Sequence, residues 1–449
     1  MIKPTHFEDF VSWVTMDAGS HNRGQSGAVG LQNHQKSRSS PAMIFSAMQS
    51  SGSRQTCLSL LLTLIILSCQ PPVQEEMETP IDEVMNSSLD RAIRQYKQMH
   101  KVLPDTLFPR SLDKNDQLVT NQRQWWTSGF FPGSLWYLYE YSGDESIKQM
   151  ALDRTATLEK EQYNNMDHDI GFKMLCSYGN GIRITGDSSA TPILIQSAAS
   201  LISRFRETTG VIKSWEGFRE YKYPVIIDNM MNLELLFWAS KVSGDPKYRK
   251  VAISHADVTL ANHFRPDNSS YHVLAYDSLT GKVLAKKTAQ GAADGSAWAR
   301  GQAWGLYGYV MTYRETKDNQ YLRQAEKIAN FILDHPSLPE DHIPYWDFNA
   351  PGIPDALRDA SAAAITASAL IELSGYVNKE LKDKYLKAAE TMIRSLSGED
   401  YLAREGKNGH FILMHGVGHK PGNSEIDVPL SYADYYFIEA MMRFRKLKP

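Results

Sequence analysis

Four segments of this 449-residue chain carry the same helix-ending signal, and they restrict the fold more than any other feature of the sequence. They read YSGDESI (141–147), ITGDSSA (184–190), VSGDPKY (242–248) and ETKDNQY (315–321), and three of them contain Gly followed by Asp. Glycine readily adopts the left-handed conformation that ends a helix, and aspartate caps the start of the next one. Each segment therefore predicts a tight turn between two helices.

Between these turns, apolar residues recur at intervals of three and four, which indicates helices. The period is clear in 135–141, 194–205, 232–242, 303–316, 321–333, 361–373, 385–396 and 435–444, whereas strand-like alternation is scarce. The turns are 43, 58 and 73 residues apart, which is too irregular for a strict solenoid repeat. About ten to twelve helices in hairpins predict an all-α fold, an (α/α)6 barrel or six-hairpin toroid. An open helical superhelix is the alternative.

The first part of the chain has the features of a targeting segment. Residues 1–42 are polar and lack a hydrophobic period, and the pattern changes at Met43 or Met48. Arg54 and Gln55 precede TCLSLLLTLIILSCQPP, in which the apolar run is shorter than the roughly 20 residues that span a bilayer. This pattern is typical of a bacterial signal peptide, and its ILSC ending resembles a lipoprotein processing site with Cys69 as the lipidated residue.

These features predict four parts. Residues 1–47 form an extension from a mis-assigned start codon, 48–68 a signal peptide, 69–80 a tether and 81–449 the (α/α)6 domain. We expect a protein of the periplasm or outer membrane that meets the membrane only through a lipid anchor at Cys69. An ordinary cleaved signal peptide, which would leave a soluble periplasmic protein, is the alternative. Of the three cysteines, only Cys176 would then remain free, so the domain depends on its core rather than on disulfides.

Composition and motifs exclude several kinds of site. The formal net charge is −3 with both signs mixed, which argues against nucleic-acid binding. There is no HExxH, no CxxC pair, no calcium loop, no GxSxG and no nucleotide-binding glycine loop, and HGVGH (415–419) has no acidic ligand beside it. We therefore expect neither a metal nor a cofactor. Aromatic residues make up 10% of the chain, and aromatic faces suit sugar rings.

The long segments predicted to be non-helical are 102–133, 207–228, 264–297, 335–360 and 405–431. Two aspartates follow or precede apolar runs, and one of them, Asp228, ends the segment 207–228. Asp169 lies before Ile-Gly-Phe, which predicts a drier position than that of Asp167, and Asp228 lies in YPVIIDNMMNLELLFW. A helix cap would lower the pKa of Asp228, whereas a proton donor needs a pKa raised by burial or by a second carboxylate. Asp169 is the candidate for that second charge. The residues around Asp228 alone favour the cap.

Other candidates lie in or beside the same segments. Trp126 lies in QWWTSGFFPGSLW (124–136), which predicts either a buried helix entry or an aromatic floor for a ring. His272 lies in YHVLAYD, and Gln290 precedes a small-residue loop. Arg300 lies between Trp298 and Trp304, where it could bind the carboxylate of an acidic sugar or one of the chain's own acids.

Taken in order, several motifs resemble the unsaturated glucuronyl hydrolases of glycoside hydrolase family 88. They are WTSGFFPGSLW, HDIGF, IIDNMMNLELL, the Tyr271–His272 loop before TAQG, WARGQAWGLYGY, YWDF (345–348), RDASAAAI (358–365) and DYYFIEA (434–440), which together cover nearly all of 120–445. The resemblance implies an (α/α)6 barrel that removes the unsaturated uronic acid left by polysaccharide lyases at the non-reducing end of an oligosaccharide. It also implies that the enzyme hydrates the C4=C5 double bond, by protonation at C4 and addition of water at C5.

The resemblance also assigns roles to individual residues. Asp228 matches the general acid and base, and Asp169 matches the second essential carboxylate. Trp126 would stack on the sugar ring. The positions that line the uronate subsite are matched by His272, Gln290, Arg300 and Trp304. The chemistry requires Asp169 and Asp228 to face each other across one pocket.

Three alternatives differ in class or substrate. An unsaturated rhamnogalacturonyl hydrolase shares the fold and chemistry, a non-catalytic glycan-binding lipoprotein would not need both aspartates, and a sugar epimerase would need paired histidines. In the C-terminal loop HGVGHKPGNSEIDVP (415–429), Lys420 and Ser424 do not clearly match the Ser- and Lys-containing motif of relatives that cleave sulfated fragments. The sequence therefore leaves the neighbouring sugar open.

Overall fold

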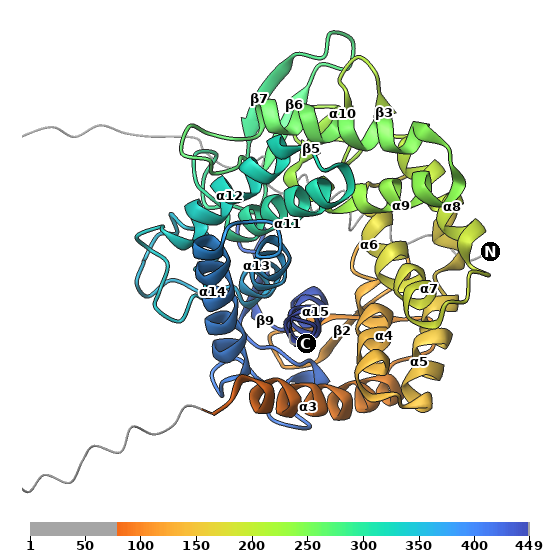
Figure 1. Ribbon diagram of the computed structural model, residues 1–449, viewed down its shortest axis with the longest axis vertical. Coiled ribbons are helices and arrows are strands. Elements are labelled where there is room, and N and C mark those ends of the chain that lie inside the picture. The colour runs from red at the N-terminus through yellow and green to blue at the C-terminus, as the bar shows by residue number, and fades with distance from the viewer. Residues whose placement is uncertain (1–78, 448–449) are drawn as a thin grey trace, which may run out of the picture. The chain divides into compact units, whose positions relative to one another are not determined.

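The computed structural model describes residues 79–447, so the predicted extension, the signal peptide and most of the tether lie outside the described residues. Within them, long helices alternate between an outer and an inner ring, which confirms the predicted (α/α)6 barrel (Figure 1). The outer helices are α3 (Ile81–Val102), α5 (Glu145–Ala156), α8 (Thr191–Ile202), α10 (Pro246–Asn262), α12 (Asn319–Leu333) and α14 (Lys379–Ser397). The inner helices are α4 (Phe130–Ser142), α6 to α7 (Ile170–Met174 and Asn180–Thr185), α9 (Leu233–Ser243), α11 (Ala299–Thr316), α13 (Ala360–Leu373) and α15 (Ser431–Arg445).

Three of the four predicted turns have the expected geometry. At each, a left-handed residue ends one helix, and an aspartate side chain accepts a backbone N–H in the next; the pairs are Gly143–Asp144, Gly244–Asp245 and Lys317–Asp318. At the fourth turn, Gly186 ends α7 as predicted, but Asp187 does not cap the next helix. It accepts the N–H of Ser189 instead, because the chain makes a further turn before α8 begins.

The inner helices are buried on almost every side. Every residue of α13 is buried except Glu372, and its sequence ASAAAITASALIEL is rich in small residues that permit close approach. None of the helices within residues 79–447 has both the length and the apolar character needed to cross a membrane. Small residues also permit tight packing between elements: a Cβ built on Gly308 of α11 would lie 2.4 Å from the Cβ of Met230.

The ring closes where the last inner helix packs on the first one. The rings of Phe130 in α4 and Tyr435 in α15 have centroids 5.4 Å apart. Further along the same two helices, the hydroxyl of Tyr137 donates a 2.8 Å hydrogen bond to Glu439. Residues separated by some 300 positions in the chain therefore form one continuous wall.

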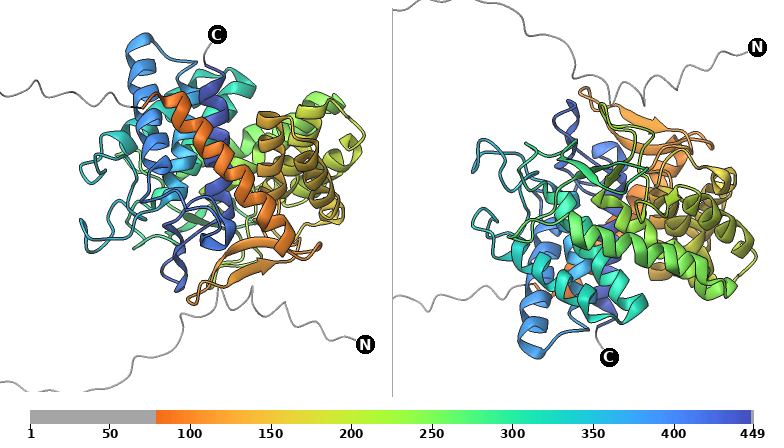
Figure 2. Two further views of the ribbon diagram at one scale, coloured as in Figure 1. Left: turned by 90° about the horizontal axis from the view of Figure 1, so that it is seen from below. Right: turned by 90° about the horizontal axis from the view of Figure 1, so that it is seen from above.

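Short antiparallel strands occupy most of the segments that were predicted to be non-helical. They are β1 (Phe108–Leu112) with β2 (Leu118–Asn121), β3 (Phe205–Arg206) with β4 (Val211–Ile212), the sheet β5 (Pro224–Ile226), β6 (Val273–Tyr276) and β7 (Val283–Lys287), and β8 (Gly416–His419) with β9 (Ser424–Val428). Figure 2 shows strands gathered at one end of the helical ring, where the inner helices begin. They form the rim of that end.

The tight contact at Gly308 gives a test of the packing. We expect Gly308→Ala to lower the free energy of unfolding by about 1–3 kcal/mol, because the added methyl group overlaps Met230. Thermal unfolding measured by circular dichroism checks this. The matched control is Gly295→Ala, where a Cβ meets no atom within 4 Å. Equal melting temperatures for the two variants would contradict the packing described.

Candidate active site

The side chains that the sequence singled out gather at the end where the inner helices begin. Asp169 directly precedes α6, and Asp228 lies in the 3₁₀ helix η3 (Ile227–Asn232) that leads into α9. Arg300 lies in the first turn of α11, and Trp126 lies in the turn that enters α4. The inner helices begin at the same end of the barrel and therefore bring together residues that are far apart in the sequence.

A direct contact between two segments places the two aspartates in one site. The backbone N–H of Phe172 donates a 3.0 Å hydrogen bond to Oδ1 of Asn232. A Cβ on Gly171 would lie only 2.7 Å from the Cα of Asn232, so glycine is what allows this approach. The start of α6 and the end of η3 thus touch, and the charge of Asp228 contributes to the raised pKa of Asp169.

Asp228 has the electrostatics of a proton donor rather than those of a helix cap. Only 7% of the residue is exposed, and its buried Oδ2 has no hydrogen-bond partner. Burial raises its pKa to about 7, although the Arg300 charge, the residue's own backbone N–H and the Trp304 indole act in the opposite direction. The indole N–H is near the carboxyl group but falls short of a hydrogen bond of normal geometry. Asp228 is therefore protonated in an appreciable fraction of molecules near neutral pH.

The pKa of Asp169 is also raised strongly. Burial raises its pKa well above the usual range, the neighbouring carboxylate of Asp167 raises it further, and Lys173 opposes the shift. The sequence-based expectation that Asp169 lies in a drier place than Asp167 is wrong, because both are 8% exposed. The difference lies in their partners: Asp167 is paired with Lys173 at 3.1 Å, and Asp169 meets the ring of buried His168 at 3.4 Å.

His272 is oriented by the backbone that follows β7. Its Nδ1 accepts hydrogen bonds from the N–H groups of Ala289 and Gln290, at 3.1 and 3.2 Å. In the neutral ring the proton must then be on Nε2, which lies 3.7 Å from Oδ2 of Asp228. Burial holds the pKa of His272 well below its usual value, so the ring is neutral. A neutral N–H donor therefore faces the acid.

Arg300 is fully buried and is held by groups of the chain itself. Its Nη1 donates to Asp359 at 2.9 Å and to the carbonyl of Val417 at 2.6 Å, and its Nη2 donates to the carbonyl of Gly418 at 2.7 Å. The guanidinium also lies 4.5 Å from the ring of Trp298. The structure thus shows the second of the two alternatives, an arginine paired with an internal acid, although its Nε has no partner in this arrangement.

The remaining candidates have different surroundings. Trp126 is half-buried and its ring centroid lies 4.8 Å from that of Tyr432. Trp304 is completely buried, 5.2 Å from Phe172, and forms part of the floor beneath Asp228. Gln290 is half-buried and donates from Nε2 to the carbonyl of Gly418 at 2.9 Å. The carbonyl of Gly418 is thus shared by Gln290 and Arg300.

Several residues of the site were missed by the sequence reasoning. Asp359 pairs with Arg300 and also caps α13 by accepting the N–H of Ser361, and RDASAAAI had been noted only as a family motif. Tyr432 faces both Trp126 and Arg300. The β8 carbonyls act through the backbone, which leaves no signature in the side chains. Residues 79–447 contain no cluster of His, Cys, Asp or Glu able to hold a metal ion. The two buried carboxyl groups with raised pKa values are suited to acid–base chemistry.

Comparison with known proteins supplies a family for this arrangement. The profile of Glycosyl Hydrolase Family 88 matches residues 103–443. An unsaturated glucuronyl hydrolase of Formosa agariphila is 47% identical over 343 residues, which are 76% of this chain and 85% of that protein.

Solved structures of similar proteins belong to the same family. The crystal structure of an unsaturated glucuronyl hydrolase specific for heparin superposes with a TM-score of 0.80 at 47% identity, covering 82% of this chain and 98% of the other. An aspartate-to-asparagine variant of the unsaturated glucuronyl hydrolase of Streptococcus agalactiae, solved in complex with dGlcA-GalNAc6S, has a TM-score of 0.72 at 32% identity. It covers 84% of this chain and 94% of its own.

The raised pKa of Asp228 predicts a pH-dependent effect on stability. Because the folded-state pKa is about 7 against an unfolded value near 4, the native state holds more protons in this window, and this carboxyl makes the protein less stable as the pH rises through it. Asp228→Asn removes this penalty. At pH 8 we expect the variant to be more stable than the parent by up to about 4 kcal/mol, with the difference vanishing toward pH 4.

Thermal unfolding of both proteins from pH 4 to pH 8 measures this difference. The matched control is Asp400→Asn, at an exposed aspartate. If Asp228→Asn and the parent protein melt with a constant difference across the series, the raised pKa is refuted.

Proposed function

The chain belongs to Glycosyl Hydrolase Family 88, and we propose a role for each residue of its site in that family's reaction. The protein is a glycosidase that removes the unsaturated 4-deoxy uronic acid from the non-reducing end of oligosaccharides released by polysaccharide lyases. It does so by hydrating the C4=C5 double bond. The observation that carries the division of roles is the pair of buried aspartates, both with a raised pKa, on adjoining segments of one site.

We propose Asp228 as the group that protonates C4. A vinyl ether is a weak base, so it needs a positioned acid that still holds its proton near neutral pH. Burial provides this at Asp228, where the pKa is raised to about 7. A bound uronate brings a further negative charge into this buried site. Substrate binding would therefore raise the pKa of Asp228 further and favour the protonated form.

The second half of the reaction requires a base. After C4 is protonated, water adds at C5 and loses a proton, and the ionised Asp228 left by the first step can accept it. The product is a hemiketal, which opens and releases the shortened sugar. The Nε2–H of His272, 3.7 Å from Oδ2 of Asp228, is placed to stabilise the carboxylate between the two steps. One carboxyl group thus supplies and recovers the proton.

Asp169 limits the negative charge around Asp228 because it remains protonated itself. Burial and the neighbouring Asp167 raise its pKa well above the usual range, so it retains its own proton. The charge of Asp228 adds to this shift, because like charges repel strongly in a buried site. This assigns Asp169 to maintaining the protonation of the site and to contacting a substrate hydroxyl. The sequence predicted that the charge of Asp169 would raise the pKa of Asp228, whereas burial is what raises it.

The other candidates form the subsite around the uronate. We assign Trp126 to stacking, since its half-buried ring is supported from behind by Phe130 and Tyr432. Gln290 and Arg300 converge on the carbonyl of Gly418, so the β8–β9 hairpin fixes both. Trp304 forms the floor. The complex of the Streptococcus agalactiae relative with dGlcA-GalNAc6S supports an unsaturated glucuronyl disaccharide as the substrate class.

Substitution of the acid tests this assignment. Asp228→Asn keeps the shape of the side chain but cannot donate the proton, so we expect kcat to fall by about 10²–10⁴. The loss of near-ultraviolet absorbance of the double bond, followed with unsaturated disaccharides from several lyases, measures the rate. Asp187→Asn, at an exposed turn, is the control and should keep the parent rate. A near-normal rate in Asp228→Asn would falsify the role of this residue.

The pH profile gives a second, independent test. Only the protonated form of Asp228 can donate, so kcat/KM should fall about tenfold per pH unit once the pH exceeds about 7. Rates measured from pH 5 to pH 9 at low substrate concentration report this limb. A profile that stays flat from pH 6 to pH 9 is incompatible with a donor of this pKa.

We also propose that the chain is exported and anchored through Cys69, in the periplasm or at the outer membrane. The support is the basic residue, short apolar run and ILSC ending of residues 54–69. Labelled palmitate should attach to the protein made in a Gram-negative bacterium and should be absent from Cys69→Ala. Cys57→Ala serves as the control and should remain labelled. Labelling that persists in Cys69→Ala would refute the anchor at this residue.

A further inference from the structure

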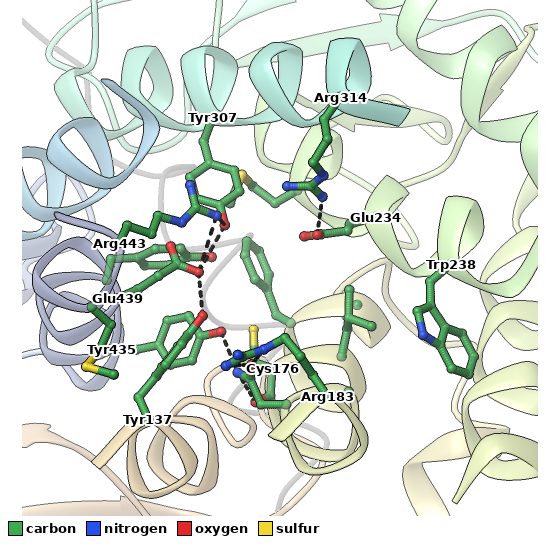
Figure 3. A pocket seen from close by; sticks show the side chains of 18 of the residues that line it. Tyr137, Cys176, Arg183, Glu234, Trp238, Tyr307, Arg314, Tyr435, Glu439 and Arg443 are labelled. Atoms are coloured by element: carbon green, nitrogen blue, oxygen red, sulfur yellow. Dashed lines mark hydrogen bonds and ion pairs between the residues drawn. The ribbon is translucent and has the colours of Figure 1, made fainter. Parts of the chain in front are cut away.

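A cavity inside the helical ring extends from the opposite end, where the inner helices end, to the start of α6. Its volume is about 560 Å³, within the roughly 300–1,000 Å³ typical of small-molecule sites. Side chains from α4, α7, α9, α11 and α15 line it, among them Tyr137, Arg183, Trp238, Arg314 and Arg443, which Figure 3 shows around a common space. None of the candidate active-site residues belongs to its lining.

One wall of this cavity is a connected polar network. Glu439 accepts hydrogen bonds from the hydroxyl groups of Tyr137, Tyr307 and Ser368, at 2.8, 3.1 and 2.5 Å. Arg443 donates to the Tyr307 hydroxyl at 2.7 Å and pairs with Glu372 at 2.9 Å (Figure 3 shows the part around Glu439). The side chains are therefore fixed in orientation before any ligand arrives.

The charges around the cavity are matched. Arg314 pairs with Glu234 on α9 and with Glu372 on α13, and Arg183 pairs with Glu140 on α4. Five cationic side chains line the space, and the carboxylates that line it or pair with them also number five; they are Arg183, Lys241, Arg314, Arg443 and Lys446 against Glu140, Glu234, Glu315, Glu372 and Glu439. This balance favours an uncharged ligand with many hydroxyl groups over an anion.

The local backbone also departs from a regular helix at this wall. The inner helix between α6 and α7 contains a π-helical turn, η2 (Leu175–Gly179), and Leu175, Cys176 and Gly179 from this turn line the cavity. Such turns occur frequently at functional sites. Stability alone does not require this end of the ring to be open and charged, since well-packed apolar residues often stabilise a fold as well as buried ion pairs do.

The lining of the cavity includes neighbours of the two acids in the chain but neither acid itself. Phe172 and Met231 line the cavity, and each follows an acid by three residues along the chain, Asp169 and Asp228 respectively. Both are almost completely buried, and Phe172 packs on the ring of Trp304 at 5.2 Å. A molecule in this cavity is therefore outside the uronate subsite.

We propose that this cavity is a second binding site, which takes a neutral monosaccharide or disaccharide. Aromatic rings such as Trp238 and Tyr137 offer faces for a sugar ring, and oriented arginine and glutamate pairs offer donors and acceptors for its hydroxyl groups. The choice of sugars rests on the proposed function, because neutral sugars are among the products when the unsaturated uronate is removed.

Binding is tested without turnover, so that an inactive enzyme does not obscure the answer. The full chain is titrated calorimetrically with glucose, N-acetylglucosamine, rhamnose and cellobiose, and with glucuronate as the charged comparison. We expect at least one neutral sugar to bind with a millimolar Kd and glucuronate to bind at least tenfold more weakly. Absence of binding by all four neutral sugars, or equal binding of glucuronate, overturns the proposal.

Two further measurements locate the sugar. Trp238→Ala should weaken binding at least tenfold and keep kcat/KM for the unsaturated disaccharide within twofold, whereas Tyr139→Ala, outside the cavity, should change neither. In the Cys57→Ser, Cys69→Ser chain, the sugar should slow modification of Cys176 by methyl methanethiolsulfonate at least threefold. Binding that leaves the reactivity of Cys176 unchanged places the sugar elsewhere and overturns the site, even if Trp238→Ala does not fold.

Discussion

The buried guanidinium of Arg300 is the contact on which the rest of the active site depends. It joins α11 to α13 through Asp359 and to β8 through the carbonyls of Val417 and Gly418. The Gly418 carbonyl also holds Gln290, whose backbone N–H orients His272, and His272 faces the acid. A buried charge is tolerated only when it is paired and hydrogen-bonded, so this one imposes a definite place on each of its partners.

The acids of the site depend on a competition between burial and the helix ends around them. The inner helices begin at this rim, and their N-terminal N–H groups favour ionised carboxylates. Asp228 lies in a 3₁₀ turn before α9, where burial outweighs this influence and the pKa rises. Asp359 lies at the same rim but has different bonds, since it caps α13 and is paired with Arg300. The same residue type thus serves as acid or as anchor according to its hydrogen bonds.

The sequence predicted those parts of the fold whose cause is local. Gly143 and Asp144 specify their turn through backbone preference and capping, and both work as expected. Helices α5 and α10 were predicted only through the turns before them, because their apolar residues follow no strong helical period. Helix α3 was not recognised, and its buried face includes the polar residues Ser88 and Gln95. The strands of two to five residues were missed since so short a run carries little alternation.

For the site, the sequence proposed Asp169 and Asp228 through a resemblance, and their contact arises from Asn232 against Gly171, which no local pattern reveals. The partners of Arg300 were equally hidden, because two of them are backbone carbonyls. Such contacts depend on long-range packing, so they cannot be predicted from composition or residue spacing.

The closure of the ring between α4 and α15 has a consequence for how the protein is made. Trp126 is supported by Tyr432, and Arg300 is held by residues 417 and 418, so the wall of the site is complete only when the last helix has joined the first. A ribosome delivers these residues in order, and no growing chain that lacks α15 contains the assembled site. The active site can therefore form only after almost the whole chain has been translated.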